Sequence, residues 1–315
     1  MLPLNYLPEP SIEVCPVSLV SLIQARKLDS NTVKNSIGNA LTAINYSIRD
    51  HVKSVVVKLN LCYYWDYSTG QTTDPRFITA LIDLIRAKTS PHVDIALLES
   101  DASAMRCKHV FRMLGYEKLA EEYGVKLVNL SEMPCDPVSV TCGNASFRFP
   151  VPKIIRDANL RISVSKIKYT MEPIKLTCAL KNTFGCIPYS KKFKYHQHLG
   201  ETIVAVNKAM PFNLFLIDGL IVSGAQPRKL GLVMASQDPV AMDVAAAEIA
   251  GINPKKIAYL RLASKEGLGK TAYIARGTPI EHFKQLYPKR DVKKLLMTKG
   301  FLLVNRLRLA GKLGL

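Results

Sequence analysis

The sequence predicts an α/β fold with a mostly parallel central sheet, flanking helices and an inserted smaller subregion. Two patterns in the first half predict it. Short runs of β-branched and other apolar residues alternate with segments that repeat apolar residues every three or four positions. Because strand–helix–strand order implies right-handed crossovers, the expected sheet is parallel and covered on both faces. The 315 residues, 48% hydrophobic and 22% charged, have an ordinary globular composition.

The first half supplies the strands and helices of this repeat. The expected elements are, in order, a helix over residues 31–48, a strand over 54–61, a helix from 75, a strand over 93–99, helices to 113 and over 116–123, and a strand over 125–130. Asp74 followed by Pro75 indicates a helix start, because a capping side chain precedes a proline whose missing N–H costs nothing there.

The second half begins with a proline-rich segment of short strand candidates. Strand candidates at 138–142 and 146–149 predict an edge hairpin, and the remaining expected elements are strands at 160–164, 214–222 and 230–235 and a helix over 239–250 capped by Asp238. We expect residues 1–290 to form one α/β domain with an inserted subregion at about 134–215. Residues 291–315 read as a basic amphipathic C-terminal tail.

The net charge of +18 is concentrated in two regions. Residues 145–200 contain eleven Lys/Arg against two acids, and residues 289–315 contain eight against one. Such clusters attract nucleic acid, lipid headgroups or phosphorylated metabolites. The tail could therefore make peripheral contact with an anionic membrane, or it could be a terminal helix docked on the core with its lysines in water.

The compartment expected from the sequence is the cytoplasm. No uninterrupted apolar run reaches roughly the 18 residues that span a bilayer, and the N-terminus lacks the basic-then-apolar pattern of a signal peptide. Seven scattered cysteines form no secreted-style framework, which indicates a reducing environment.

Polar side chains follow most of the predicted strands. In open α/β sheets ligands bind beyond the carboxyl ends of the strands. The residues expected there are Lys58, Asn60, Asp74, Glu99, Asp101, Lys166, Lys168, Lys181, Asn182, Asp218, Asp238 and Asp243. Lysines beside helix N-termini predict a phosphate or carboxylate cradle, and nearby carboxylates predict a divalent-metal site or a general base. Any one of these lysines taken alone is more often a solvated surface ammonium.

We therefore expect an enzyme that acts on a small anionic, phosphate- or carboxylate-bearing metabolite. The expected catalytic residues are Lys166, Lys181, Asp218 and His198; the substrate-binding residues are Lys58, Asn60, Asp74, Lys168 and Asn182; and the metal ligands are Asp101, Asp238 and Asp243. Two of these have competing interpretations. Asp238 is a good helix cap in its own right, and His198 belongs to a basic loop that could simply be solvated.

Several motifs together resemble the family called domain of unknown function 362. They are VVVKLNL, TTDPRFITALI, SVSKIKYT, ALKNTFGCIP, LIDGLI and DPVAMDVAAAEIAGI, in that order between about residues 50 and 270. The resemblance implies an α/β fold and a site at the lysines, asparagines and aspartates within these motifs, but no reaction. The chain departs from the family pattern in lacking a Cys-x-x-Cys-x-x-Cys run, and in reading Ser223–Pro227 where relatives often have a glycine-rich stretch.

Two other classes of function stay open at this point. Cys62, Cys178 and Cys186 lie near the expected site turns and predict, as an alternative, an iron–sulfur or redox protein. The three could hold an iron–sulfur cluster or one could be a reactive thiol, although buried structural cysteine is the commoner fate. The basic region 145–200 could bind nucleic acid, although it carries no recognisable reading motif. The sequence contains no Walker loop, dinucleotide fingerprint or nucleophile elbow.

Overall fold

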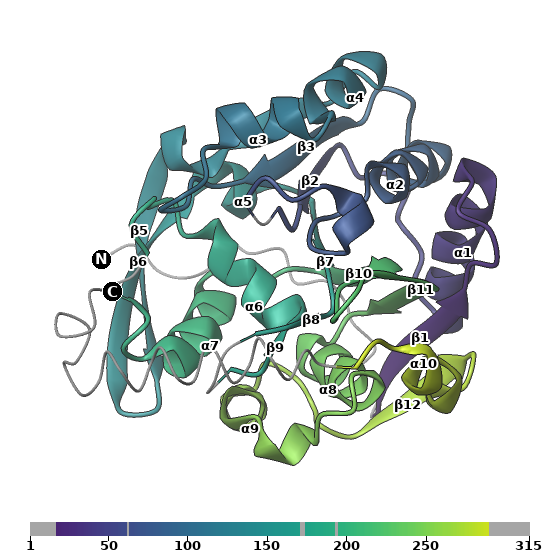
Figure 1. Cartoon of the computed structure of the whole chain (residues 1–315). Helices are drawn as coiled ribbons and strands as arrows, with labels where there is room; N and C mark the ends of the chain where they lie inside the picture. Colours follow the sequence, from purple (N-terminus) through teal and green to yellow (C-terminus); the bar gives the residue numbers. More distant parts are fainter. Residues whose placement is uncertain (1–16, 62, 171–173, 193–194, 290–315) are drawn as a thin grey trace, which may run out of the picture.

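An eight-stranded sheet forms the centre of the computed structural model, which describes residues 17–61, 63–170, 174–192 and 195–289 (Figure 1). Its strands lie in the order β12 (Tyr273–Gly277), β1 (Ser18–Gln24), β11 (Arg228–Ser236), β10 (Leu214–Val222), β7 (Leu160–Ser165), β2 (Ser54–Lys58), β3 (Asp94–Glu99) and β4 (Lys126–Asn129). Of these strands only β11 runs against the others, pairing antiparallel with β1 and β10. The expected mostly parallel α/β fold is confirmed.

Helices cover both faces of the sheet. One face is covered by α1 (Ser30–Ala43), α2 (Pro75–Lys88), α3 (Cys107–Met113) and α4 (Tyr116–Glu122). The other is covered by α5 (Lys153–Asp157), α6 (Ala179–Thr183), α7 (Leu199–Ala209), α8 (Pro239–Ile249), α9 (Ala258–Lys265) and α10 (Ile280–Leu286). Alternate strand residues feed the two cores: Val55 and Val57 of β2 pack on the first face and Val56 on the second, as the two-residue period of a strand requires.

The helix starts follow from their capping residues. The Asp74 carboxylate accepts the backbone N–H of Arg76, with Pro75 at the first helical position of α2. Asp238 in the same way accepts the N–H groups of Val240 and Ala241 at the start of α8. These caps satisfy backbone donors that a helix leaves unpaired, and both helix starts predicted from the sequence are confirmed.

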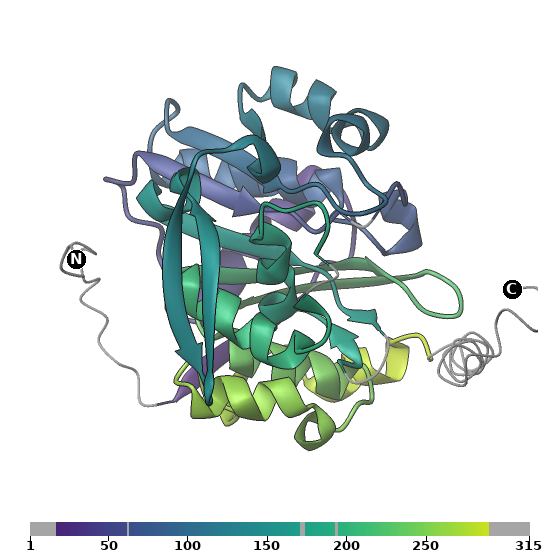
Figure 2. The same cartoon turned by 90° about the vertical axis from the view of Figure 1, so that its left-hand side faces the viewer.

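The expected hairpin is present as β5 (Cys135–Cys142) and β6 (Ala145–Pro152), which pair along their whole length and pack on α7. Figure 2 shows it standing across the strands of the main sheet. The range 134–215 is not a separate unit throughout, because it also contains β7, which lies between β2 and β10 in the middle of the sheet. Residues 291–315, expected as a tail, lie outside the described residues.

Smaller elements complete the edge of the sheet where the parallel strands end. They are η1 (Tyr67–Thr69), η2 (Leu130–Glu132), β8 (Lys168–Tyr169), β9 (Leu176–Thr177), η3 (Phe184–Cys186) and, after α8 in the chain, η5 (Pro254–Lys256). Across the described segments of the chain, every helix is too short or too polar to cross a bilayer.

Candidate anion-binding site

A buried ion pair lies where β2 and β3 end. Lys58 Nζ is 2.8 Å from Glu99 Oε1, and it also donates to the carbonyl of Leu59 at 2.7 Å. The other Glu99 oxygen accepts the backbone N–H of Leu61 at 3.1 Å. Gly185 of η3 closes over the pair, since a Cβ there would lie 2.9 Å from Lys58 Nζ. The pair is thus fixed by two strand ends and covered by a turn at Gly185, where a Cβ would require Lys58 to move.

Lys192 is a second buried ammonium beside this pair, and it has neutral partners. Its Nζ donates to Ser100 Oγ and to the carbonyl of Asp101, both at 2.7 Å, and the residue is 9% exposed. Within the described residues it forms no ion pair. Burial lowers the pKa of Lys192 to about 8; Glu99 opposes this effect and the positive charge of Lys58 adds to it. Lys192 is not predicted from the sequence, because its surroundings, SKKFK, resemble a solvated basic loop.

Three residues expected to bind substrate meet beside the end of β7. Lys168 Nζ donates to Asn60 Oδ1 at 2.6 Å, and Asn60 Nδ2 donates to Asn182 Oδ1 at 2.9 Å. Asn182 is held in turn by Ser163 Oγ and the carbonyl of Val164. The order of donors and acceptors fixes both amides in one orientation. Residues from the loop after β2, from β8 and from α6 therefore form one polar network.

The expected residues Lys166, Asp218 and Asp74 form a closed cluster one strand further along. Lys166 Nζ is 3.0 Å from Asp218 Oδ2, which also accepts the backbone N–H of Asp74 at 2.7 Å. All three residues are fully enclosed. Burial raises the pKa of Asp218, an effect that the charge of Lys166 opposes. The Asp74 carboxylate is held separately by Arg76. This cluster fixes the start of α2 against β10.

The three expected metal ligands are not brought together, and the described part of the chain contains no group of three or more His, Cys, Asp or Glu side chains placed to hold a metal ion. Asp101 accepts the N–H of Cys107 and pairs with Arg106. Asp238 caps α8. Asp243 accepts the N–H groups of Ala179 and Leu180 and the hydroxyl of Tyr259. Burial raises the pKa of Asp243 to about 7.

Of the cysteine and histidine candidates, Cys178 and Cys186 are buried and His198 is exposed. Cys62 falls outside the described residues. Burial raises the pKa of Cys186 to about 12 and that of Cys178 well above its usual value, so both thiols stay protonated near neutral pH. His198 is exposed and directly precedes α7, and Lys181 is half-buried on α6. Of the four expected catalytic residues, Lys166 and Asp218 form one buried ion pair, whereas Lys181 is half-buried and His198 is exposed.

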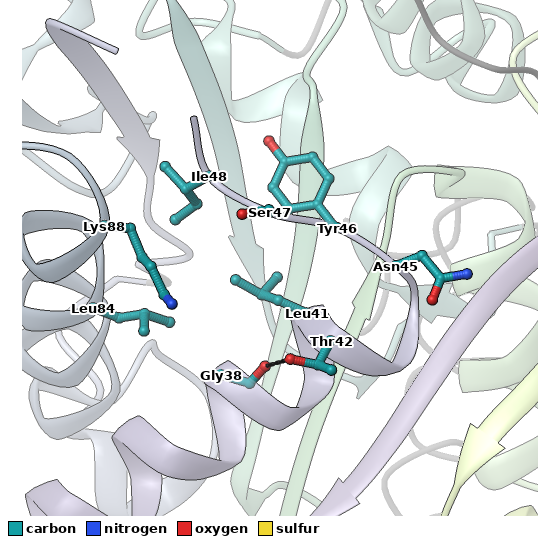
Figure 3. A pocket seen from close by; sticks show the side chains of 9 residues that line it. All are labelled: Gly38, Leu41, Thr42, Asn45, Tyr46, Ser47, Ile48, Leu84 and Lys88. Carbon is teal, nitrogen blue, oxygen red and sulfur yellow. Dashed lines mark hydrogen bonds between the residues drawn. The ribbon is translucent and has the colours of Figure 1, made fainter. Parts of the chain in front are cut away.

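A hollow of about 300 Å³ lies at the other edge of the sheet, between α1, the turn after it and the end of α2 (Figure 3). Its one charged lining residue is Lys88. Because α2 begins at Asp74 beside the buried clusters and ends at Lys88, the hollow is about 20 Å from them at 1.5 Å per helical residue. Most of its polar lining residues come from the end of α1 and the turn after it. We place the candidate site at the carboxyl ends of the strands, where buried charged side chains from several strands lie.

The sheet order and the lysines at its carboxyl edge define an α/β protein with a buried cationic centre. The chain belongs to the domain of unknown function 362 family, whose profile matches residues 55–248. That range includes the ion pairs, the amide network and Lys192.

Two individual proteins are similar over part of the chain. A thylakoid-associated protein of Synechocystis sp. is 30% identical over an alignment of 143 residues that covers 41% of this chain and 44% of that relative. The lactate racemase apoprotein from Thermoanaerobacterium thermosaccharolyticum has a similar structure, with a TM-score of 0.49 at 12% identity, over 75% of this chain and 57% of that one.

Proposed function

We propose that this protein is an enzyme that acts on a small anionic metabolite bearing a phosphate or carboxylate. The proposal rests on the burial of Lys192 and on its hydrogen-bond partners. Lys192 is a buried ammonium at the carboxyl edge of a parallel sheet, and its hydrogen-bond partners are neutral oxygens. A buried charge is costly unless it is paired, and an anionic ligand would supply the missing negative charge.

The neighbouring groups favour the same ligand class. Lys168, Asn60 and Asn182 place further donors beside the ends of β2 and β7. Ligands of open α/β sheets bind in this position. The ion pair of Lys58 and Glu99 ties the ends of β2 and β3 together, so it orients the site whether or not it touches the ligand.

Lys192 also supports catalysis rather than binding alone. A side chain whose pKa is about 8 can both release and take up a proton near neutral pH, which is what general acid–base chemistry requires. The catalytic roles expected for Lys166, Lys181, Asp218 and His198 stay predictions. For Lys166 and Asp218 we favour a positioning role, because their mutual ion pair is fully enclosed.

Anion titration tests the proposal. Sulfate, phosphate and malonate are titrated calorimetrically into the wild type, Lys192→Met and Lys118→Met, a control on the exposed surface of α4. We expect at least one anion to bind the wild type and the control alike, and Lys192→Met to lose about tenfold or more in affinity. A thermal melt of each variant shows that it is folded. Equal affinity in all three proteins, or no binding by the wild type, would overturn the proposal.

Other expected partners remain separate proposals. Nucleic-acid binding by residues 145–200 predicts an affinity that falls steeply with salt, and filter binding with RNA and DNA measures it. Peripheral membrane contact through residues 291–315 predicts that removing them abolishes vesicle binding.

A further inference from the structure

Four aromatic side chains gather on the surface beside the candidate site. Tyr63, Tyr64 and Trp65 are 51%, 37% and 55% exposed in the loop after β2, and Tyr189 is 45% exposed after η3. We call these four residues the aromatic rim. Most other large apolar side chains of the described chain are buried, so this group accounts for more than half of those that are exposed.

Contacts to one segment join the two loops of the rim. The Tyr64 hydroxyl accepts the backbone N–H of Arg106 at 3.2 Å, and Ser103 Oγ donates to the carbonyl of Ser190 at 3.4 Å. Ser103 and Arg106 both belong to the connection between β3 and α3. The loop that carries Tyr64 and the loop that carries Tyr189 therefore contact the same short segment, which brings the two loops close together.

Positively charged side chains lie on the same segments as the aromatic rim or on segments that contact it. Arg106, Lys108 and Lys191 are exposed on the segments that carry or contact the rim. Of the acids on the same segments, Asp101 is mostly covered and paired with Arg106, and Asp66 accepts the backbone N–H of Ser68. Three cations and two acids lie on these segments, so the surface is aromatic with a small excess of positive charge.

Tyr63 and Trp65 are the most exposed members of the rim. Tyr63 has a left-handed backbone conformation, with φ of 53°, which costs energy for any residue with a Cβ. Trp65 leaves over half of its surface in water. Contiguous exposed aromatics of this kind mark interaction surfaces.

We propose that the aromatic rim docks on an anionic lipid bilayer. Trp and Tyr are the side chains that prefer the boundary between headgroups and hydrocarbon, where the ring is buried and the polar atom stays wet. Adjacent Lys and Arg side chains are attracted to anionic headgroups. Single-stranded nucleic acid, which also stacks on aromatics, needs cations spaced along a groove, whereas here three aromatics are consecutive in one loop.

Docking at this surface is independent of Lys192 and of the proposed enzymatic function. It also differs from membrane contact through residues 291–315, because the side chains that enter the interface belong to the folded core. The candidate site would then open close to the membrane surface.

Trp65 makes the proposal directly testable, since it is the only tryptophan of the chain. Phosphatidylglycerol vesicles are added to the full-length protein while the emission of Trp65 is recorded and bound protein is sedimented. We expect a blue shift with phosphatidylglycerol, a smaller one with phosphatidylcholine, and reversal by high salt, because the electrostatic part is screened.

Matched variants locate the contact. Tyr63→Ser with Tyr64→Ser, and separately Lys108→Glu, should each weaken sedimentation about tenfold. Ile274→Ser on β12 and Lys284→Glu on α10 change equally exposed residues elsewhere and should leave binding unchanged.

Three outcomes would overturn the proposal. Sedimentation without any change in Trp65 emission would place the membrane contact elsewhere in the chain. Quenching of Trp65 by oligothymidine with no response to vesicles would assign the rim to nucleic acid. No response to either would show that the rim is not a docking surface for lipid.

Discussion

Lys166 and Lys192 are both buried lysines near the ends of parallel strands, but their partners differ in charge. Lys166 faces the Asp218 carboxylate at 3.0 Å, and both residues are fully enclosed. Lys192 faces a hydroxyl and a carbonyl, keeps a small exposed surface and has a lowered pKa. We infer that a buried lysine paired with a carboxylate of the same chain stabilises the fold. A buried lysine without such a partner marks a position where a ligand can supply the negative charge.

Breaking the balanced pair should have the largest effect. Lys166→Met leaves the Asp218 carboxylate buried without its cation, and we expect a loss of about 3–5 kcal/mol in the free energy of unfolding. Urea denaturation at pH 7 measures it. Lys192→Met should change stability by only about 1 kcal/mol, because lost hydrogen bonds are offset by removal of a costly charge.

The double variant Lys166→Met/Asp218→Asn sharpens this comparison. Removing both charges should recover part of the loss seen in Lys166→Met. If Lys192→Met destabilises the protein as much as Lys166→Met, the distinction between the two lysines is wrong.

Asp243 is the acidic counterpart of Lys192, a buried carboxyl whose described partners are backbone N–H groups and a tyrosine hydroxyl. Its pKa is raised from 3.8 to about 7, so between those values the folded state binds more protons than the unfolded state. Its contribution to stability therefore falls as the pH rises from about 4 to 7, by up to about 4 kcal/mol.

Asp243→Asn should remove this dependence. Relative to the wild type, the variant should become more stable as the pH rises through this window, as followed by urea denaturation at several pH values. A stability difference that does not change with pH would contradict the prediction.

The lowered pKa of Lys192 has a consequence of the opposite sign. Between about 8 and the usual 10.5 the unfolded state binds more protons, so the contribution of Lys192 makes the wild type more stable as the pH rises. At about 1.4 kcal/mol per pKa unit, the full effect is about 3 kcal/mol. Unfolding of the wild type and Lys192→Met from pH 7 to 10.5 measures it, with Lys118→Met as the control. Parallel pH profiles of the wild type and Lys192→Met would count against an unbalanced buried charge.

Much of the fold is predictable because local patterns agree with it. The β-branched runs of β2 and β7 and the Asp-Pro starts of α2 and α8 act within a few residues. The first strand, β1, is not predicted. Its residues have no clear alternation, and its place is set by pairing with β11, more than 200 residues away.

The candidate site is predictable only in part for the same reason. Asn60, Lys168 and Asn182 follow strands whose ends meet, so their convergence follows from the parallel order. Lys192 gives no local signal, because its burial depends on contacts with Ser100 and Asp101 across the fold. Of the three aspartates expected to hold a metal, Asp101 follows β3, Asp238 caps α8 and Asp243 lies within α8, and each accepts backbone N–H groups.

We propose above that Lys192 is a buried ammonium that binds an anion. Nuclear magnetic resonance of isotope-labelled lysine side chains tests this most directly. The Lys192 signal, assigned by its absence in Lys192→Met, is followed against pH with and without sulfate, which stays doubly charged throughout. We predict a pKa of about 8 in buffer and a clear rise with sulfate, since a bound anion favours the charged form. A pKa near 10.5 that sulfate does not change would contradict the claim.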